Sequence, residues 1–245
     1  MTMNLQGRRC LITGASGALG TAMARRLARE GAHLLLHANS RLETVQALAD
    51  EISASGGAAE ALAFDVTDGS AAQAACERLL AGGPVQVIIN NAGIHDDAVF
   101  PGMRAEQWHR VIDVSLDGFF NVTRPLLLPM LRTRWGRVIN ISSVAAIMGN
   151  RGQVNYAAAK GALNSATKAL SLEVAGRGVT VNAIAPGIIE SPMAGAVFDA
   201  KAVAALVPAG RAGTPDEVAA LAAFLAGPEA GYITGQVISI NGGMA

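Results

Sequence analysis

The chain has 245 residues, of which 51% are hydrophobic and 16% are charged, and its formal net charge is zero. This length and composition allow one large α/β domain with a sizeable core, or at most two small domains. The charge balance gives no global reason to expect binding to nucleic acid or to an anionic membrane. No apolar run is long enough to span a bilayer and no signal-peptide pattern precedes the first expected strand, so we expect a cytoplasmic protein.

Short apolar runs alternate with helical patterns along the chain. A strand is predicted at residues 9–13, and a glycine-rich turn follows it. Leu19, Met23 and Leu27 then recur on one face of an amphipathic helix, and Gly31 suits its C-terminal cap. The next predicted elements are strand 32–37, helix 42–53, strand 61–64, helix 71–80, strand 85–89 and a long helical stretch at 105–132.

Pro125 and Pro129 are expected to bend that long helical stretch. Thr214 as N-cap and Pro215 in the first turn mark the start of a later helix. The elements predicted after the long stretch are strand 137–141, helix 155–175, strand 179–185, helix 215–225 and strand 236–240.

Strands that are apolar throughout and alternate with helices indicate a parallel sheet covered on both faces. We therefore predict an α/β fold, a single doubly wound Rossmann-type domain spanning residues 1–245, with helices on both faces of its parallel sheet. Residues 187–211 lack a clear strand and follow the carboxyl end of a strand, where such folds bind ligands. They are predicted to form a substrate lid.

The turn at residues 13–20 reads Thr-Gly-Ala-Ser-Gly-Ala-Leu-Gly. Its glycines allow the backbone to approach a pyrophosphate, and the following helix N-terminus supplies N–H groups and positive potential. Such turns are common, so this one alone is a weak signal, which its position after the first strand strengthens. The cofactor-binding residues predicted here are Gly14, Ser16, Gly17, Ala18, Leu19 and Gly20.

The second predicted strand ends without the acidic residue that usually binds the ribose 2′-hydroxyl of NAD. Asn39, Ser40 and Arg41 instead offer donors and a fixed positive charge to a 2′-phosphate, which favours NADP(H). Alternatively, Ser40 caps the next helix and Arg41 is solvated. The two interpretations are compatible, because a capping hydroxyl can also face a phosphate.

Tyr156 and Lys160 are four residues apart on a predicted helix and therefore share one face. An ammonium group lowers a tyrosine pKa from its usual value of about 10, and such a tyrosine can exchange a proton with an alcohol or alkoxide. Ser143 follows the fifth predicted strand and could hydrogen-bond the same carbonyl oxygen. Standing alone, a tyrosine and a lysine on one helix are more often surface residues.

Together these motifs resemble the short-chain dehydrogenase/reductase family over essentially the whole chain. The matching segments, in family order, are residues 13–20, Asp65-Val66, Asn90-Asn91-Ala92-Gly93, Ser143, Tyr156 with Lys160, and Pro186-Gly187. The resemblance implies an NADP(H)-dependent oxidoreductase that moves a hydride between nicotinamide and a carbonyl carbon. No metal is expected, because no cluster has metal-ligand spacing, and Cys10 and Cys76 are expected to be buried and reduced.

The resemblance also implies a role for each matched residue. Tyr156 would be the general acid, Lys160 would bind the nicotinamide ribose and lower the tyrosine pKa, and Ser143 would orient the carbonyl. Asp65 and Val66 would contact the adenine. The remaining cofactor contacts, on the ribose side and at the nicotinamide end, would come from Asn90, Asn91, Ala92, Gly93, Pro186, Gly187, Ile189 and Ser191.

Two residues depart from the family pattern. Ala18 stands where a glycine is usual, and Gly17 beside it is expected to absorb the difference. Ser115 stands where many members have an asparagine that is thought to position a water in a proton relay. A serine hydroxyl can still hold a water with shorter reach, so we count Ser115 among the catalytic residues and expect retained activity with an altered proton supply.

Within the family, residues 148–160, 179–182, 232–235 and 241–244 look like those of bacterial 3-oxoacyl-(acyl-carrier-protein) reductases. This likeness implies NADPH-dependent reduction of a 3-oxoacyl thioester to a 3-hydroxyacyl thioester, in fatty-acid or in polyketide or aryl-polyene synthesis. Those reductases are homotetramers, and the apolar helix faces here suit such an assembly. The alternatives are an enzyme for a free small alcohol, sugar or steroid, and a non-catalytic cofactor-binding subunit.

Carrier proteins are acidic, so a reductase that meets one needs basic residues near its active-site mouth. Arg134 and Arg177 match positions with this role in the similar enzymes, and Arg132 and Arg137 are close in sequence; all four could equally be ordinary solvated arginines. His95 is expected at the pocket edge rather than as a base. The residues expected to border the acyl pocket are Val99, Phe100, Pro101 and Met103.

Overall fold

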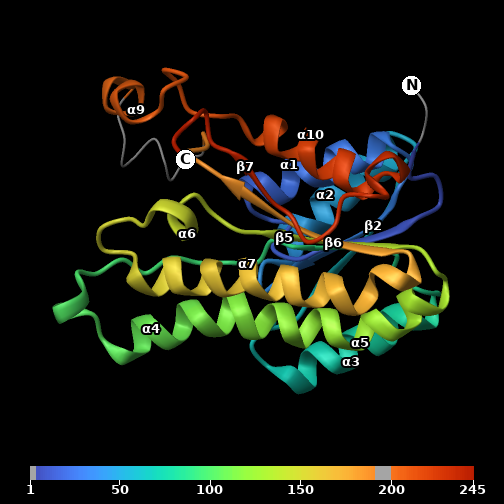
Figure 1. Ribbon diagram of the computed structural model, residues 1–245. Coiled ribbons are helices and arrows are strands. Elements are labelled where there is room, and N and C mark those ends of the chain that lie inside the picture. The colour runs from blue at the N-terminus through green and yellow to red at the C-terminus, as the bar shows by residue number, and fades with distance from the viewer. Residues whose placement is uncertain (1–3, 191–199) are drawn as a thin grey trace.

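The computed structural model describes residues 4–190 and 200–245. Seven strands form one sheet in the order β3-β2-β1-β4-β5-β6-β7, and every neighbouring pair is parallel (Figure 1). The strands are β1 Arg9–Ile12, β2 His33–Ala38, β3 Ala58–Ala63, β4 Val87–Asn90, β5 Gly136–Ile141, β6 Val179–Pro186 and β7 Val237–Ile240. This sheet confirms the predicted parallel α/β fold.

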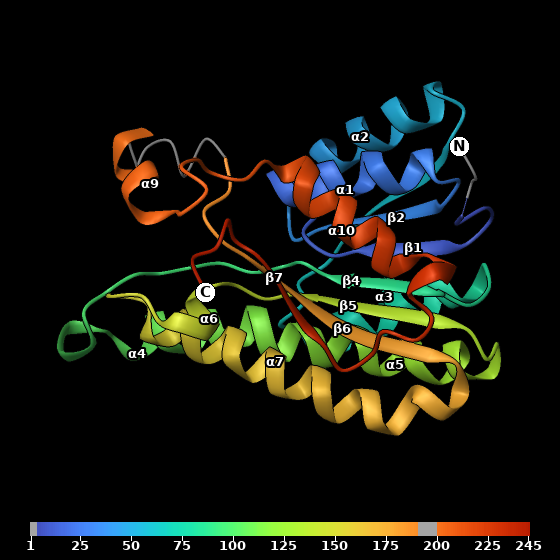
Figure 2. The ribbon, with the colours of Figure 1, turned by 45° about the horizontal axis from the view of Figure 1, so that its top comes forward.

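Helices cover both faces of the sheet. One layer holds α1, α2 and α10, and the other holds α3, α4, α5 and α7 (Figures 1 and 2). The α-helices of the described residues are α1 Ala18–Arg29, α2 Leu42–Ala54, α3 Gly69–Ala81, α4 Ala105–Ile112, α5 Gly118–Arg132, α6 Ala145–Met148, α7 Val154–Val174, α9 Ala200–Leu206 and α10 Pro215–Ala226. Because both faces are covered, every residue of β5 and β6 is buried, whereas the edge strand β3 is partly exposed.

The strand order reverses between β1 and β4, which are hydrogen-bonded neighbours although β2 and β3 lie between them in the chain. In open parallel sheets a crevice forms at such a switch point, outside the carboxyl ends of the strands. The loops that follow β1, β4, β5 and β6 therefore meet at one edge of the molecule. Helices α6 and α9 lie at this same end (Figure 2).

The long helical stretch changes its hydrogen bonding before it reaches the two prolines that were expected to bend it. Regular α-helical bonding gives way to a π-helical segment at Asp113–Asp117, whereas α5 runs through Pro125 and Pro129. The wider turn lies where Gly118 packs against Val66, close enough that a Cβ on Gly118 would be 2.9 Å from the Val66 Cγ2. The π-helical segment therefore lies next to the close contact of Gly118 with the loop that contains Val66, and not at either proline.

Helix caps only partly follow the sequence prediction. Thr214 caps α10 as expected: its Oγ1 accepts a hydrogen bond from the Glu217 amide at 3.3 Å, and Glu217 accepts one from the Thr214 amide at 2.8 Å. Ser40 is not the N-cap of α2. The N-cap is Arg41, and its side chain makes no capping hydrogen bond. Helices α6 and α9 were not predicted, since elements this short show little periodicity.

Both cysteines are buried, as expected, and burial raises the pKa of the Cys76 thiol to about 12. Within the described ranges, no group of three or more histidine, cysteine or carboxylate side chains is placed to bind a metal ion. The helices of those ranges also lack the combination of length and apolar composition that crossing a membrane requires.

Candidate active site

The glycine turn is shaped by two close backbone approaches. Gly14 has φ +65°, and a Cβ there would lie 3.1 Å from the Ala92 Cα. A Cβ on Gly20 would lie 2.5 Å from the Gly14 carbonyl oxygen, so only glycine lets α1 start this close to the turn. A Cβ on Gly17 would have only that oxygen nearby, at 3.6 Å. The tight positions are therefore 14 and 20, and Ala18 is the first residue of α1.

The ends of β1 and β4 are joined by side-chain hydrogen bonds. Thr13 Oγ1 accepts from the amides of Asn91 and Ala92 at 3.0 and 2.9 Å. The Asn91 side-chain amide donates to the carbonyl oxygens of Thr13 and Gly14 at 2.9 and 3.0 Å. Asn91 thus braces the turn through its side chain, while Ala92 and Gly93 follow it at the crevice.

Asn90 does not line the crevice, contrary to expectation. Its side chain is buried between the sheet and α5, where it donates to Thr123 Oγ1 at 3.0 Å and to Asn140 Oδ1 at 2.9 Å. Asn90 is the last residue of β4, so its side chain points to one face of the sheet rather than beyond the strand end. The residue belongs to a buried polar network, not to the ligand surface.

The residues expected at the adenine and the 2′-phosphate lie beyond β3 and β2. Asp65 is exposed and accepts from the Thr67 amide and hydroxyl, both at 2.8 Å. Val66 is buried in the core, so its side chain is not exposed at the surface. The three residues that follow β2 are all exposed: Asn39, Ser40 and Arg41.

His37, for which the sequence indicated no role, hydrogen-bonds the glycine turn at Gly14. Its Nδ1 accepts from the Gly14 amide at 3.3 Å, and its Nε2 lies 2.8 Å from the Phe64 carbonyl oxygen. A carbonyl can only accept, so Nε2 carries the hydrogen and the ring is neutral. Burial lowers the pKa of His37, which favours this state. No motif marks this histidine, because its partners lie on other segments.

Ser143, Tyr156 and Lys160 come together at the carboxyl edge of the sheet. The Ser143 side chain lies close enough to the Tyr156 hydroxyl to lower its pKa. The Lys160 Nζ lies 5.7 Å from the centre of the Tyr156 ring and donates to the Ile141 carbonyl oxygen at 2.8 Å. A serine two residues beyond β5 and two side chains one turn apart on α7 therefore form one cluster, whose hydroxyl and amine groups can exchange protons with a bound molecule.

The charges of this cluster are set by burial. Burial raises the pKa of Tyr156, the nearby Ser143 side chain lowers it and the negative charge of Asp97 raises it further. Burial lowers the pKa of Lys160 to about 8. The expected lowering of the tyrosine pKa by the lysine is therefore not found in the protein alone, because the lysine is itself removed from water and its charge is disfavoured.

Ser115 lies beside the lysine. It is buried in the π-helical segment, and its Oγ has no hydrogen-bond partner among the described residues. A Cβ added to Gly93 would lie 3.0 Å from the Lys160 Nζ and 3.6 Å from the Ser115 Oγ, so these polar atoms converge where Gly93 has no side chain. A buried hydroxyl without a partner marks a place for water or a ligand group.

The nicotinamide end predicted from the sequence is only partly described. Pro186 ends β6, and its carbonyl oxygen accepts from the Val144 amide at 2.8 Å, next to Ser143. Gly187 packs against the backbone of Asn241, where a Cβ would lie 2.8 Å from Cα. Ile189 forms a parallel bridge with Gly213. Ser191 and part of the predicted lid, 187–211, lie outside the described residues.

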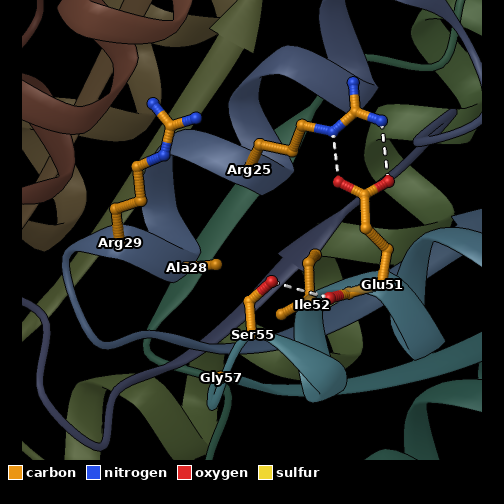
Figure 3. Close-up of a pocket in the computed structure, with 7 residues that line it drawn as sticks. All are labelled: Arg25, Ala28, Arg29, Glu51, Ile52, Ser55 and Gly57. Carbon is orange, nitrogen blue, oxygen red and sulfur yellow. Dashed lines mark hydrogen bonds and ion pairs between the residues drawn. The ribbon is translucent and has the colours of Figure 1, made fainter.

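Two hollows open on the surface of α1. One, of about 150 Å³, lies between α1 and α2, where Arg25 binds Glu51 through two hydrogen bonds of 2.8 and 2.7 Å (Figure 3). It contains none of the predicted site residues. The other, of about 750 Å³, is lined at one end by Ser16, Gly17 and Ala18, and so continues from the glycine turn.

The arginines expected near the active-site mouth lie at the opposite edge of the sheet. Arg134 is in the turn before β5 and Arg177 in the turn before β6, so both precede their strands, whereas Ser143 follows β5. Six residues of β5 separate the two edges by about 20 Å. The turns after α5 and α7 lie far from α6 and α9 (Figure 2). The expected position is therefore wrong within one chain.

The structure also divides the four arginines into two kinds. Arg132, Arg134 and Arg177 are exposed. Arg137 is buried, donates to the Gly227 carbonyl oxygen at 3.2 Å and stacks over the Trp135 ring at 4.4 Å. Arg137 therefore has a structural position and no access to a partner.

Comparison with known proteins finds similar sequences along nearly the whole chain. The family described as "Enoyl-(Acyl carrier protein) reductase" matches residues 14–245. The 3-oxoacyl-(acyl-carrier-protein) reductase of Aggregatibacter actinomycetemcomitans is 42% identical over 236 residues, covering 96% of this chain and 98% of that protein. Its namesakes in Escherichia coli K12 and Thermotoga maritima are 42% and 41% identical over 245 residues, with 99% of each chain covered.

The glycine geometry predicts different tolerance at two neighbouring positions. Gly20→Ala should reduce stability by about 1–3 kcal/mol, because its Cβ meets backbone, and should weaken NADPH binding at least about tenfold. Gly17→Ala is the matched control and should change stability by less than about 0.5 kcal/mol. Urea unfolding and fluorescence titration with NADPH measure both effects. Equal effects in the two variants would contradict the geometry.

The pKa of Lys160 predicts a fall in activity with rising pH. The lysine is charged below its pKa of about 8 and neutral above it. The kcat/KM for the cofactor, which reports groups of the free enzyme, should reach half its maximum near pH 8 and then fall about tenfold per pH unit. A steady-state profile from pH 6.5 to 9.5 measures this. The residual activity of Lys160→Met should show no inflection near pH 8. If the inflection remained in this variant, it would have to be assigned to a group other than Lys160.

Proposed function

The chain belongs to the short-chain dehydrogenase/reductase family. We propose that it uses NADPH to reduce 3-oxoacyl thioesters on acyl carrier protein to 3-hydroxyacyl thioesters. The observation that carries this proposal is the convergence of Ser143, Tyr156 and Lys160 at one sheet edge. Full-length relatives named for this reaction support the substrate and its place in fatty-acid synthesis.

The residues present fit a nicotinamide cofactor. Because Gly14 and Gly20 have no side chains, the backbone of the turn packs closely and leaves the N-terminus of α1 accessible to a pyrophosphate. Gly93, which also has no side chain, leaves room beside Lys160. Such a cofactor supplies the hydride for the carbonyl carbon. The three exposed residues after β2 include a fixed positive charge and no carboxylate, which supports NADPH over NADH.

The remaining chemistry belongs to the side chains. Ser143 and Tyr156, which lie close together, hold the carbonyl oxygen and stabilise the negative charge that develops on it. Tyr156 gives its proton to this oxygen as a general acid. Lys160 stabilises the tyrosinate that results while it remains charged. A water between Ser115 and Lys160 would satisfy the unpartnered Ser115 hydroxyl and return the proton.

Two exposed apolar surfaces support a homotetramer. Phe120 and Leu128 on α5 and Leu172 on α7 are more than half exposed on one helical layer. The edge strand β7 lies on another side of the molecule, with the fully exposed Tyr232 just before it. Two different two-fold interfaces are what a tetramer with dihedral symmetry requires.

Such an assembly also gives Arg134 and Arg177 a function. They lie at the sheet edge opposite the Ser143–Tyr156–Lys160 cluster of their own chain, so in an assembly they would lie closer to the site of a neighbouring subunit. There they would bind the acidic carrier protein, together with the exposed Arg132. We therefore propose that carrier-protein docking crosses a subunit boundary.

The test of the proposed function is NADPH oxidation with acetoacetyl-CoA and with a 3-oxoacyl carrier protein as parallel substrates. Turnover should be faster on the carrier-bound substrate, and Tyr156→Phe should lower kcat by about 10²–10⁴-fold, because the general acid is removed. NADPH binding without turnover of either substrate would reject the proposal and direct the search to free alcohols or a non-catalytic role.

Ser115→Asn tests the altered proton supply. An asparagine reaches further than serine, so this variant should raise kcat and change the pH dependence of the reaction. Pre-steady-state and steady-state rates across pH, with the neighbouring exposed Asp117→Asn as control, measure the change. An unchanged turnover and an unchanged pH–rate profile in Ser115→Asn would show that this position does not supply protons.

Charge reversal tests the docking surface. The double variant Arg134→Glu, Arg177→Glu should raise KM for the carrier-bound substrate about tenfold and leave acetoacetyl-CoA kinetics within about twofold, since only the carrier protein meets the patch. Arg29→Glu, an exposed arginine on α1, is the control. Equal losses on both substrates, or a loss only in the control, would place docking elsewhere.

A further inference from the structure

His37, on β2, binds the glycine turn with both its backbone and its side chain. Its carbonyl oxygen accepts from the Ala15 amide at 2.8 Å, and its Nδ1 accepts from the Gly14 amide at 3.3 Å. On the other side of the ring, Nε2 donates to the Phe64 carbonyl oxygen at 2.8 Å. The side chain is buried, so water does not compete for these bonds. The proposed mechanism gives this residue no role.

The backbone amides of the turn fall into two groups. Those of Gly14 and Ala15 are bound to His37, and that of Gly17 is bound to the Gly14 carbonyl oxygen at 3.2 Å. The amides without a hydrogen-bond acceptor among the described residues are those of Ser16, Ala18, Leu19 and Gly20. These free amides lie at the N-terminus of α1, where an anion binds. His37 therefore holds one side of the turn and leaves the other side for a pyrophosphate.

The bond to Gly14 needs an acceptor on the ring. A neutral imidazole offers one acceptor, and the Phe64 carbonyl oxygen fixes the single hydrogen on Nε2. A protonated ring carries a hydrogen on both nitrogens, so Nδ1–H and the Gly14 amide would face each other as two donors. The turn is held from its other side by Asn91, which donates to the Gly14 carbonyl oxygen at 3.0 Å. Relief of the conflict therefore requires the turn to change shape.

The surroundings of the ring favour its neutral form. Burial lowers the pKa of His37, whereas the Phe64 hydrogen bond and the negative charge of Asp65 raise it, and the net shift is downward. The strand segments and the turn beside the ring, residues 11–18 and 61–64, contain no charged side chain. Asp65 is thus the charged group that these neighbours bring to the ring, and the ring becomes protonated only in acid.

The helices over the two faces of the sheet add no further charge to this place. None of the buried residues of α1, α2, α3 and α5 is charged. The one titratable group among them is Cys76, and its pKa of about 12 keeps it neutral. A change of charge on His37 is therefore not compensated from the helix layers.

We propose that His37 is a positioning residue of the cofactor site: its neutral ring holds the Gly14 amide and so fixes the turn in the shape that binds a pyrophosphate, and protonation of the ring releases the turn and weakens cofactor binding. This inference rests on the proposed binding of NADPH at the turn. It does not depend on which carbonyl compound is reduced. As the ring is protonated, the fraction of molecules with a competent turn falls, and the apparent dissociation constant of the cofactor rises by the same factor.

The test measures NADP⁺ binding by isothermal titration calorimetry at pH 5.0 and pH 7.5, and compares the ratio of the two dissociation constants between variants. The oxidised cofactor is used because reduced nicotinamides decompose in acid. His37→Asn keeps an acceptor near the position of Nδ1 and cannot be protonated, whereas His37→Leu has no acceptor. His33→Asn, a partly exposed histidine on the same strand, is the matched control.

The dissociation constant should rise in acid at least about threefold more in the unaltered protein and in His33→Asn than in His37→Asn. The 2′-phosphate of NADP⁺, like other phosphate monoesters, has a pKa of about 6, but it is common to all variants and cancels in this comparison. At pH 7.5, His37→Leu should bind about fivefold more weakly than the unaltered protein, the size of one neutral hydrogen bond. His37→Asn should recover most of that loss.

An equal ratio in the unaltered protein and in His37→Asn would overturn the inference. Tighter binding in acid would also overturn it, because the charged ring would then attract the phosphates. A His37→Leu variant that is less stable in urea but binds NADP⁺ as tightly as the unaltered protein would show that the residue only supports the fold. If neither variant folds, ¹⁵N NMR of the ring decides: NADP⁺ should lower the pKa of His37, and an unchanged or raised pKa opposes the inference.

Failure of the proposed function is seen separately. If the unaltered protein does not bind NADP⁺ at pH 7.5, the cofactor part of the proposed function is rejected, and this inference is rejected with it. If the protein binds NADP⁺ but does not reduce a 3-oxoacyl thioester, only the proposed substrate is rejected, and the comparison of the variants still decides the role of His37.

Discussion

The hydrogen bonds between the ends of β1 and β4 are the constraint on which the active site depends. Thr13 and Asn91 join these strand ends at the point where the order of the sheet reverses. Their bonds set the distance between the glycine turn and Gly93, and Gly93 in turn adjoins the Lys160 amine. A change in this junction would therefore move the cofactor turn and the proton-transfer cluster together.

Burial governs the chemistry of that cluster. Lys160 is buried and donates to the carbonyl oxygen of Ile141 rather than to a carboxylate, so its pKa falls to about 8, while burial raises the pKa of Tyr156. Both shifts disfavour charge in the protein alone. A ligand that brings negative charge and hydroxyl groups to this edge would favour the charged lysine, and under the proposed function this would link cofactor binding to proton transfer by Tyr156.

The two edges of the sheet have different uses. The carboxyl edge holds Ser143, Tyr156 and Lys160, which the proposed function makes catalytic, and the unpartnered Ser115 hydroxyl. The amino edge carries Arg134 and Arg177, and the exposed apolar side chains lie on the helices and strand between the edges. The two arginines and the Ser143–Tyr156–Lys160 cluster therefore lie at opposite edges of one chain, and the proposed docking of a carrier protein depends on the proposed assembly.

The sequence by itself determined the features that depend on near neighbours in the chain. Apolar runs predicted all seven strands to within a few residues. The Tyr156–Lys160 spacing placed both side chains on one helix face, and only the resemblance to a family added Ser143 to them. The tertiary structure decided which distant segments meet. In it the Asn90 side chain is buried, the Ser115 hydroxyl has no hydrogen-bond partner among the described residues, Arg134 lies at the amino edge of the sheet, and His95 lies beside Tyr156. Local patterns fix a turn or a helix face through short-range geometry, but packing and strand order set which face meets which, and these depend on the whole chain.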